Sequence, residues 1–313
     1  MAGIRTALTD LLGIEAPIVQ APIGPCAGPE LAAPVSGAGG LGMLSVTWQA
    51  VELIDRHVAR TRELTDRPFG VNVILEWDQH ARVEACLAAG VGVVSLFWGD
   101  PEPYVDAVHQ AGAIVMHTVA TPEEARRAVG AGVDVIVAQG VEAGGHVWGE
   151  TATLPLVPAV VDAAGPVPVV AAGGIADGRG LAAALVLGAA GAWMGTRFLA
   201  SEEAFAHVEY KRAVVDAVPQ DTVLATLFDA EWPNANHRVL RTEVVREWET
   251  GGRTANGRSA MLPTPDVTGD LSGLAFYAGQ SAGLVGEVLP AGEIVRRTVE
   301  EAREVLRRLA ANI

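Results

Sequence analysis

A short unit that repeats along the chain constrains its fold more than any other feature. The unit is a helix tail, a glycine and an apolar strand, and it occurs at residues 36–45, 87–96, 109–118, 129–138 and 186–195. The glycine suits the left-handed residue that commonly ends a helix. The strands are apolar at consecutive positions, which predicts burial on both faces, as in a parallel sheet.

Further apolar runs complete a set of eight predicted strands, at residues 16–23, 41–46, 69–75, 91–98, 113–119, 133–140, 166–174 and 191–198. Helical patterns lie between them, and one begins with Thr121 as N-cap and Pro122 at the first helical position. This regular alternation predicts an α/β protein with a (β/α)₈ TIM barrel. An open doubly wound sheet is the alternative, but the G-x-G-x-x-G fingerprint expected after its first strand is absent.

The alternation ends near residue 200, which suggests three regions. We expect a barrel over residues 1–200, a lid or insertion domain over 201–275, and a C-terminal segment over 276–313 that returns to the barrel. The amphipathic pattern of 291–312 predicts a helix that closes the barrel wall.

Within the lid, two stretches have helical patterns and one is typical of a loop. Residues 203–218 and 237–249 are predicted to be helical. Residues 250–270 are rich in Gly, Pro, Thr and Asp, and we expect a loop there.

Charge and cysteine content narrow the possible classes of function. The net charge of −15 argues against binding to nucleic acid or to a membrane surface. Two cysteines, Cys26 and Cys86, do not form a disulfide framework and fit a reducing compartment. The N-terminus does not resemble a secretory signal, and no apolar window is long enough to span a membrane. We therefore expect a cytoplasmic protein.

Unusual residues follow the predicted strands, where the active site of such a barrel forms. His146 stands out because Gly144 and Gly145 precede it and Gly149 follows shortly after, in VEAGGHVWG. Glycine is used where the chain must be approached closely or where φ is positive. The stretch therefore suggests a bulky or flat ligand against the backbone, with one imidazole aimed at it.

Two glycine-containing turns follow the seventh and eighth predicted strands. Gly173-Gly174 and Gly195-Thr196 would supply backbone N–H groups at helix starts, where an anion is favoured. Barrels often bind a phosphate between these two loops. The pair predicts a phosphate-bearing cofactor, although the same glycines could simply turn the chain.

Several motifs together resemble one known family. QAPIGPCAGPELAAPVSGAGGLGMLS, FGVNVIL, VIVAQGVEAGGHVWG, AAGGIADGRGLAAALVLGAAGAWMGTRF and GQSAGLV occur in this order. They are similar to motifs of the nitronate monooxygenase family, formerly called 2-nitropropane dioxygenases. Related FMN-dependent TIM barrels share much of the pattern, including the flavin-type enoyl-acyl-carrier-protein reductase and some NADH:quinone reductases.

The resemblance implies FMN as cofactor and a role for each matching residue. The residues implied to bind FMN are Ala21, Pro22, Ile23, Asn72, Gln139, Gly144, Gly145, Gly173, Gly174, Met194, Gly195 and Thr196. The isoalloxazine would lie against residues 21–23, and the phosphate would lie at the last five positions of that set. His146 matches the active-site histidine of the family.

The activity implied is the FMN-dependent oxidation of alkyl nitronates, and possibly of nitroalkanes, by O₂ to a carbonyl compound and nitrite. His146 would remove the α-proton of a nitroalkane or orient a nitronate. An anionic substrate would need positive charge, for which His146, His117 and Arg238 are candidates. The alternatives are an NAD(P)H-dependent FMN reductase of enoyl thioesters or quinones, and a flavin-binding protein without turnover of its own.

Some residues and properties stay open at this point. His117 either faces the site or supports it from behind, and Cys26 is a weak candidate nucleophile. Residues 232–238 (WPNANHR) either contact substrate or cap a helix beginning near Val239. The spacing of His and acidic residues gives little support for a metal site. The natural substrate, the electron donor and the oligomeric state stay open as well.

Overall fold

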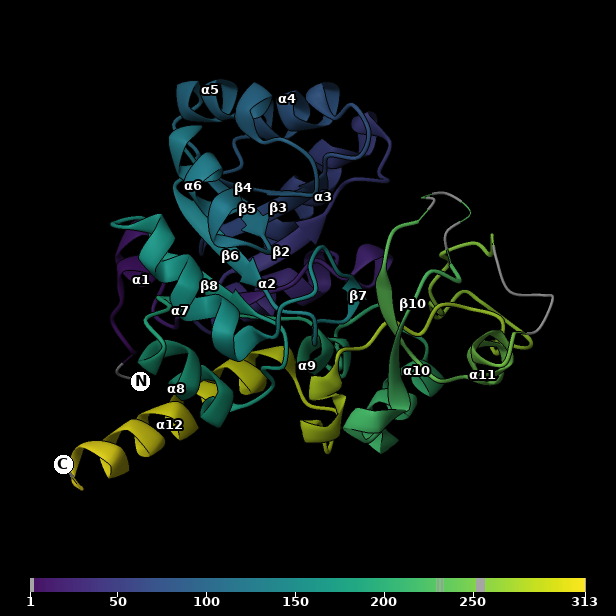
Figure 1. Cartoon of the computed structure of the whole chain (residues 1–313). Helices are drawn as coiled ribbons and strands as arrows, with labels where there is room; N and C mark the ends of the chain where they lie inside the picture. Colours follow the sequence, from purple (N-terminus) through teal and green to yellow (C-terminus); the bar gives the residue numbers. More distant parts are fainter. Residues whose placement is uncertain (1–2, 229, 231, 233, 252–256, 313) are drawn as a thin grey trace.

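A computed structural model describes residues 3–228, 230, 232, 234–251 and 257–312. Within them, eight parallel strands form the central sheet (Figure 1): β1 (Ile18–Gln20), β2 (Gly42–Ser45), β3 (Phe69–Ile74), β4 (Val93–Phe97), β5 (Ile114–Val119), β6 (Val135–Gln139), β8 (Val169–Ala172) and β9 (Gly191–Met194). Their order is β1-β9-β8-β6-β5-β4-β3-β2. A parallel bridge between Val19 and Leu41 joins β1 to the start of β2, so the sheet closes. The predicted TIM barrel is confirmed.

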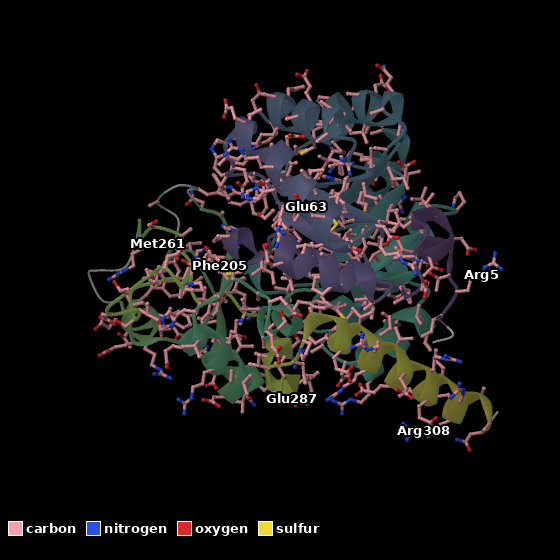
Figure 2. All side chains as sticks on the ribbon, turned by 180° about the vertical axis from the view of Figure 1, so that it is seen from behind. Arg5, Glu63, Phe205, Met261, Glu287 and Arg308 are labelled. Atoms are coloured by element: carbon pink, nitrogen blue, oxygen red, sulfur yellow. The ribbon has the colours of Figure 1, made fainter. Side chains whose placement is uncertain are left out.

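Helices cover the outside of the barrel: α2 (Pro29–Gly37), α3 (Val51–Leu64), α4 (His80–Ala88), α5 (Glu102–Gln110), α6 (Pro122–Gly130), α7 (Thr153–Ala164), α8 (Gly178–Val186) and α12 (Ala291–Ala310). The C-terminal helix α12 packs between α8 and α2 and completes the wall, as predicted. Ile294, Val295 and Val299 form its buried face. Its last turns project from the body, with Arg308 near the end (Figure 2).

Helix ends follow the local sequence. Gly90, Gly112, Gly132 and Gly188 follow α4, α5, α6 and α8, and each has a positive φ between 72° and 94°. This confirms the left-handed role expected of the repeated glycine. Thr121 caps α6, because its Oγ1 accepts a hydrogen bond from the Glu124 N–H at 3.2 Å.

The barrel interior is packed with apolar side chains at the end opposite the strands' carboxyl termini. This layer includes Val19, Met43, Met116, Val135 and Val170. Helix α1 (Ala7–Leu12) adds Leu8 and Leu12 to the same layer. The Thr6 hydroxyl donates to the Ala190 carbonyl, just before β9 begins. Helix α1 therefore closes the amino end of the barrel and leaves the carboxyl end for a site.

All eight strands are shorter in the structure than predicted, and the first and last are two of the clearest cases. The first was expected over 16–23, but only Ile18–Gln20 is paired as β1. The last was expected over 191–198, but β9 ends at Met194 and a short helix, α9 (Thr196–Leu199), follows. The apolar run continues because α9 is also buried, and an apolar run cannot show where strand gives way to helix.

The lid contains α10 (Val208–Asp216), the 3₁₀ turn η2 (Pro219–Asp221), β10 (Thr222–Ala225), β11 (His237–Leu240) and α11 (Glu243–Glu249). A further 3₁₀ turn, η3 (Gln280–Leu284), follows in the C-terminal segment. The apolar core of the lid includes Tyr210, Phe228 and Val239. The prediction of one helix over 237–249 was wrong for its first four residues, which pair with β10 instead. The lid boundaries at 201 and 275 stay predictions, and part of the predicted loop, 252–256, lies outside the described residues.

One strand of the lid sheet comes from the barrel. The loop after β6 contains β7 (Gly145–His146), which pairs antiparallel with β11. The register sets His146 opposite His237 and Gly145 opposite Arg238. The three-stranded sheet has the order β10-β11-β7. The lid is therefore joined by backbone hydrogen bonds to the segment that carries His146.

None of the helices in the described part of the chain is both long enough and apolar enough to cross a bilayer.

Candidate active site

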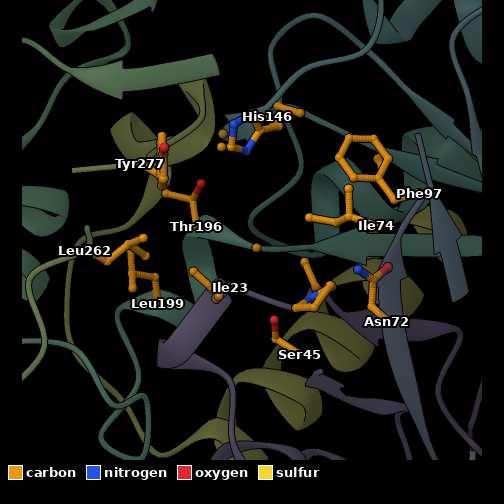
Figure 3. Close-up of a pocket in the computed structure, with 18 of the residues that line it drawn as sticks. Ile23, Ser45, Asn72, Ile74, Phe97, His146, Thr196, Leu199, Leu262 and Tyr277 are labelled. Carbon is orange, nitrogen blue, oxygen red and sulfur yellow. The ribbon is translucent and has the colours of Figure 1, made fainter. Parts of the chain in front are cut away.

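A cavity of about 610 Å³ lies at the carboxyl ends of the barrel strands, beneath the lid. This volume is typical of pockets for cofactors and small molecules. Figure 3 shows Asn72, Ile74 and Phe97 on one side of it and Leu199 and Leu262 on the other, with His146 on a third side. Among the described residues, no Asp, Glu, Lys or Arg lines it.

The cavity brings together most of the residues proposed from the sequence. Those that line it are Ala21, Pro22, Ile23, Asn72, Gln139, Gly144, Gly145, His146, Gly173, Gly174, Gly195 and Thr196. They come from the loops after β1, β6, β8 and β9 and from the end of β3. Strands that are far apart in sequence therefore place them at one mouth, as a barrel requires.

Met194 does not reach the cavity. Its side chain is fully buried in the barrel wall, and its carbonyl accepts a hydrogen bond from the Ala21 N–H at 2.8 Å. The neighbouring Trp193 lines the cavity instead. The sequence prediction of a cavity residue was therefore wrong by one position, because side chains of a strand alternate between opposite faces.

Gln139 holds the His146 loop. Its Nε2 donates to the His146 carbonyl at 3.0 Å, and its Oε1 accepts from the Trp148 N–H at 3.0 Å. The carboxamide thus fixes the backbone at the histidine and two residues after it, while it lines the cavity. A contact with a cofactor would be additional to these two bonds.

Glycine is required at position 144 for a structural reason that the sequence did not reveal. A Cβ at this position would lie 2.3 Å from the Gly279 nitrogen and 2.6 Å from the Ala278 carbonyl carbon. Both are backbone atoms that cannot rotate away. The close approach of segment 278–279 therefore requires glycine here, independently of any ligand.

The glycines after β8 fit a bound phosphate group. Gly174 has φ +73°, and a Cβ built there meets only the Glu142 Cβ, at 3.9 Å, so the backbone faces open cavity. Across from it, the Thr196 hydroxyl accepts a hydrogen bond from the Gly279 N–H at 2.9 Å. Ser281 also lines this part of the cavity. Hydroxyls and bare backbone N–H groups suit an anionic group where no basic side chain lies.

His146 lies against a cluster of aromatic rings, one of which, Tyr277, also lines the cavity. The Trp232 indole stacks on its imidazole with ring centroids 4.1 Å apart and planes at 30°. His237 and Tyr277 each have centroids 5.7 Å from it. The Nε2 of His146 is buried and has no hydrogen-bond partner within the described residues.

This environment keeps His146 neutral. Burial lowers its pKa from 6.5 to about 3, and nearby His237 lowers it further. His117 does not line the cavity, and burial lowers its pKa to about 4. The expectation that His146 or His117 supplies positive charge is therefore wrong near neutral pH. A neutral imidazole offers one N–H donor and one lone pair instead.

The remaining open residues lie outside the cavity lining. Arg238 lies in β11 and donates from Nε and Nη2 to the Val141 carbonyl, so it supports the His146 loop. Val239 also lies in β11, which makes the helix-cap reading of 232–238 wrong. Cys26 is fully buried, and burial raises the pKa of its thiol to about 12, unsuited to a nucleophile. Within the described residues, no three His, Cys, Asp or Glu could share a metal ion.

Sequence reasoning missed much of the cavity wall, namely Ser45, Ile74, Phe97, Leu199, Met261, Leu262, Tyr277 and Ser281. Three of these residues are the last of their strands: Ser45 in β2, Ile74 in β3 and Phe97 in β4. Their position at strand ends could have identified them as cavity residues. Met261 and Leu262 belong to the predicted lid loop, where apolar residues within a polar segment were a weaker signal.

Comparison with known proteins gives the family of the chain. The sequence model of the nitronate monooxygenase family matches residues 5–81 and 76–301. The chain belongs to this family. The nitronate monooxygenases and their structural relatives are flavoenzymes, so this member is a flavin-dependent oxidoreductase.

The names of its relatives describe several different activities. It is 33% identical to the nitronate monooxygenase of Pseudomonas aeruginosa, over 94% of this chain and 98% of that one. It is 41% identical to a (3aS,4S,5R,7aS)-5-hydroxy-7a-methyl-1-oxo-octahydro-1H-indene-4-carboxyl-CoA dehydrogenase of Mycobacterium tuberculosis, over 83% and 72%. FabK from Thermotoga maritima superposes with a TM-score of 0.87 at 37% identity, over 99% and 100%.

Proposed function

We propose that the protein uses FMN to oxidise alkyl nitronates, and nitroalkanes after deprotonation, with O₂ to a carbonyl compound and nitrite. One observation carries the proposal. A neutral, partly unsatisfied histidine lines a cavity that also offers Gly174 and Thr196 for a phosphate. Family membership then favours nitronate chemistry over other reactions of such a site.

FMN is supported by the residues at the cavity floor. Ala21, Pro22 and Ile23 form an apolar wall for the flavin ring, and Asn72 provides a polar group beside it. The phosphate is assigned to the backbone near Gly174 and to the hydroxyl of Thr196, whose side chain lines the cavity. When bound, FMN supplies the redox centre that takes electrons from the substrate and passes them to O₂.

His146 is assigned the proton-handling role. Its lone pair can accept the α-proton of a nitroalkane, which leaves the nitronate in the cavity. With a preformed nitronate, the imidazole N–H can instead donate to a nitro oxygen and hold the anion. Both roles use the neutral form that burial favours.

The visible spectrum of the purified holoenzyme under anaerobic conditions tests the function. Addition of an alkyl nitronate should bleach the flavin, and admission of O₂ should restore it with release of nitrite. A parallel cuvette receives NADH or NADPH. Bleaching by the nicotinamide but not by the nitronate would reject the proposal.

A second candidate is an oxidoreductase acting on acyl thioesters. The observation in its favour is the 41% identity to the carboxyl-CoA dehydrogenase, which exceeds the 33% to the Pseudomonas nitronate monooxygenase. The cavity wall that includes Leu199, Met261 and Leu262 would suit an apolar acyl group. Bleaching of the flavin by NAD(P)H, followed by reoxidation with an enoyl thioester, would favour this candidate. A flavin that no such compound reduces would favour a binding protein without turnover.

The cellular location stays a prediction. Cys26 and Cys86 are both free and buried, which fits the cytoplasm.

A further inference from the structure

We propose that Trp232, contributed by the lid, is a positioning residue for His146: its indole fixes the plane of the imidazole and shields it from water. Trp232 does not line the cavity, so its action on the substrate passes through the histidine. The inference rests on the role proposed above for His146.

The stacking geometry distinguishes Trp232 from the other rings around His146. Its centroid is 4.1 Å from that of the imidazole, and the planes are 30° apart. Trp98 meets the imidazole at 6.4 Å and 86°, and Tyr277 at 5.7 Å and 50°. A near-parallel ring at this distance covers one whole face of the imidazole, whereas an edge contact leaves most of a face open.

Barrel loops hold Trp232 in place. It is 4% exposed, and its ring meets Trp98 at 4.5 Å and Trp77 at 5.4 Å, both edge to face. Trp98 itself has φ +65°, which is unfavourable for a bulky residue. Its ring also meets Trp148, at 4.4 Å. Backbone strain of this kind persists only where surrounding contacts determine it, and here it serves the packing of Trp232.

Burial, rather than nearby charge, is the main reason that His146 is neutral. From β11, His237 faces it, with Nδ1 2.9 Å from the Ala235 carbonyl and Nε2 accepting from the Phe228 N–H. Both ring nitrogens of His237 are therefore engaged with backbone groups. From segment 275–279, Tyr277 faces it with a phenol ring. Among the described residues, no acidic group raises the pKa of His146 against the effect of burial, which is the first cause of its lowering.

Removing the indole should therefore admit water to the imidazole and free its rotation. Hydration favours the charged form of a histidine, so its pKa should rise toward the ordinary value of 6.5. A protonated His146 has no lone pair for an α-proton. The variant should lose activity with nitroalkanes as the pH falls, while the parent keeps it.

The test compares Trp232→Ala and Trp232→Phe with Trp248→Ala, which removes a tryptophan from α11, away from the cavity. Each holoenzyme is labelled with ¹³C at histidine Cε1, and the His146 signal is assigned by its loss in His146→Gln. In the parent, Trp232→Phe and Trp248→Ala, the signal should stay neutral down to about pH 5. In Trp232→Ala it should titrate with a pKa at least about one unit higher.

Kinetics provide the second readout. For Trp232→Ala, kcat for a nitroalkane should fall about tenfold or more near neutral pH, and kcat/KM should gain an acid limb absent from the parent. Trp232→Phe should restore most of both. If Trp232→Ala fails to fold, Trp232→Leu takes its place, because it keeps apolar volume without a flat ring.

An unchanged His146 titration in the Ala or Leu variant would overturn the proposal. So would a Trp248→Ala variant that shifts the titration as much, because the effect would then be general loosening of the lid. The NMR readout needs no turnover. If the parent flavin were not reduced by any nitro compound, the proposed function would fail while the role of Trp232 would still be decided.

Discussion

The imidazole of His146 lies between the indole of Trp232 and a cavity that no charged side chain of the described residues lines. Gln139 binds the backbone at His146 and at Trp148. The chemistry of this residue therefore depends on groups from the barrel and the lid together. A neutral imidazole with a free lone pair results, and this form can serve proton transfer from carbon.

Replacing His146 by Ala should remove that proton transfer and leave cofactor binding intact. We expect kcat for a nitroalkane to fall by about 10²- to 10⁴-fold, the usual contribution of a general base. Oxygen consumption measures the loss, and the flavin absorbance per protein measures retention. His57→Ala in α3 is the control, since it lies on the outer wall. Full activity in His146→Ala would remove this residue from the mechanism.

Among single residues, the sequence predicted those whose neighbours in the chain mark them as unusual. His146, Gly173 and Gly174 stand at strand ends beside other glycines, and all three line the cavity. Trp232 could not be predicted, because nothing local in a lid loop shows which ring it will stack upon. Met194 was misplaced because the sequence does not show the exact phase of a short strand.

At the scale of elements, two segments converge on the loop that follows β6. Besides β11, the segment at 278–280 packs on it, with the Gln280 N–H donating to the Glu142 carbonyl at 3.0 Å. The Gly279 N–H reaches Thr196 in the loop after β9. This segment therefore links the two loops that are assigned the substrate base and the phosphate.

Gly144→Ala tests that junction. The new methyl would meet backbone of residues 278 and 279 at distances as short as 2.3 Å, so one segment must shift. We expect a loss of about 1–3 kcal/mol in the free energy of unfolding, as for other overpacked sites, and weaker flavin retention. Urea denaturation and flavin absorbance measure both effects.

Gly92→Ala is the matched control, because a Cβ there has nothing within 4 Å. An equal effect of the two substitutions would show that the general cost of replacing glycine, rather than the junction, explains the result.

Elements with a regular repeat were predictable, and elements of the lid were not. The barrel helices and strands each bury a face against a neighbouring repeat, so the pattern reports the fold directly. In contrast, His237–Leu240 follows a helix-compatible pattern but forms β11, because β10 and β7 supply hydrogen-bonding partners on both sides. Long-range pairing of this kind overrides local preference.

For the whole molecule, two histidines with lowered pKa values, His117 and His146, set a limit on acid stability. Burial lowers the pKa of His117 to about 4 and that of His146 to about 3, whereas both are near 6.5 when exposed. The unfolded chain therefore binds more protons than the folded one below pH 6.5. Their contribution to stability is fully present above that value and is lost as the pH falls toward the folded pKa values.

When the pH falls from about 7 to about 5, each of these histidines should lower the free energy of unfolding by about 2 kcal/mol. Urea denaturation at the two pH values measures the difference. His117→Gln, which keeps a side-chain donor, should recover about half of the combined loss. A pH dependence identical to that of the parent would contradict the assignment to His117.

The sharing of β7 between the barrel loop and the lid sheet also bears on how such enzymes diverge. Exchange of the lid alone, in evolution or in a laboratory chimera, would present a foreign β11 to the strand that carries His146. A new lid sequence should therefore keep the position of His146 only if β7 is exchanged together with β11. Lineages that diversify their substrates should change residues 141–149 and 237–240 in step, while the outer barrel helices vary independently.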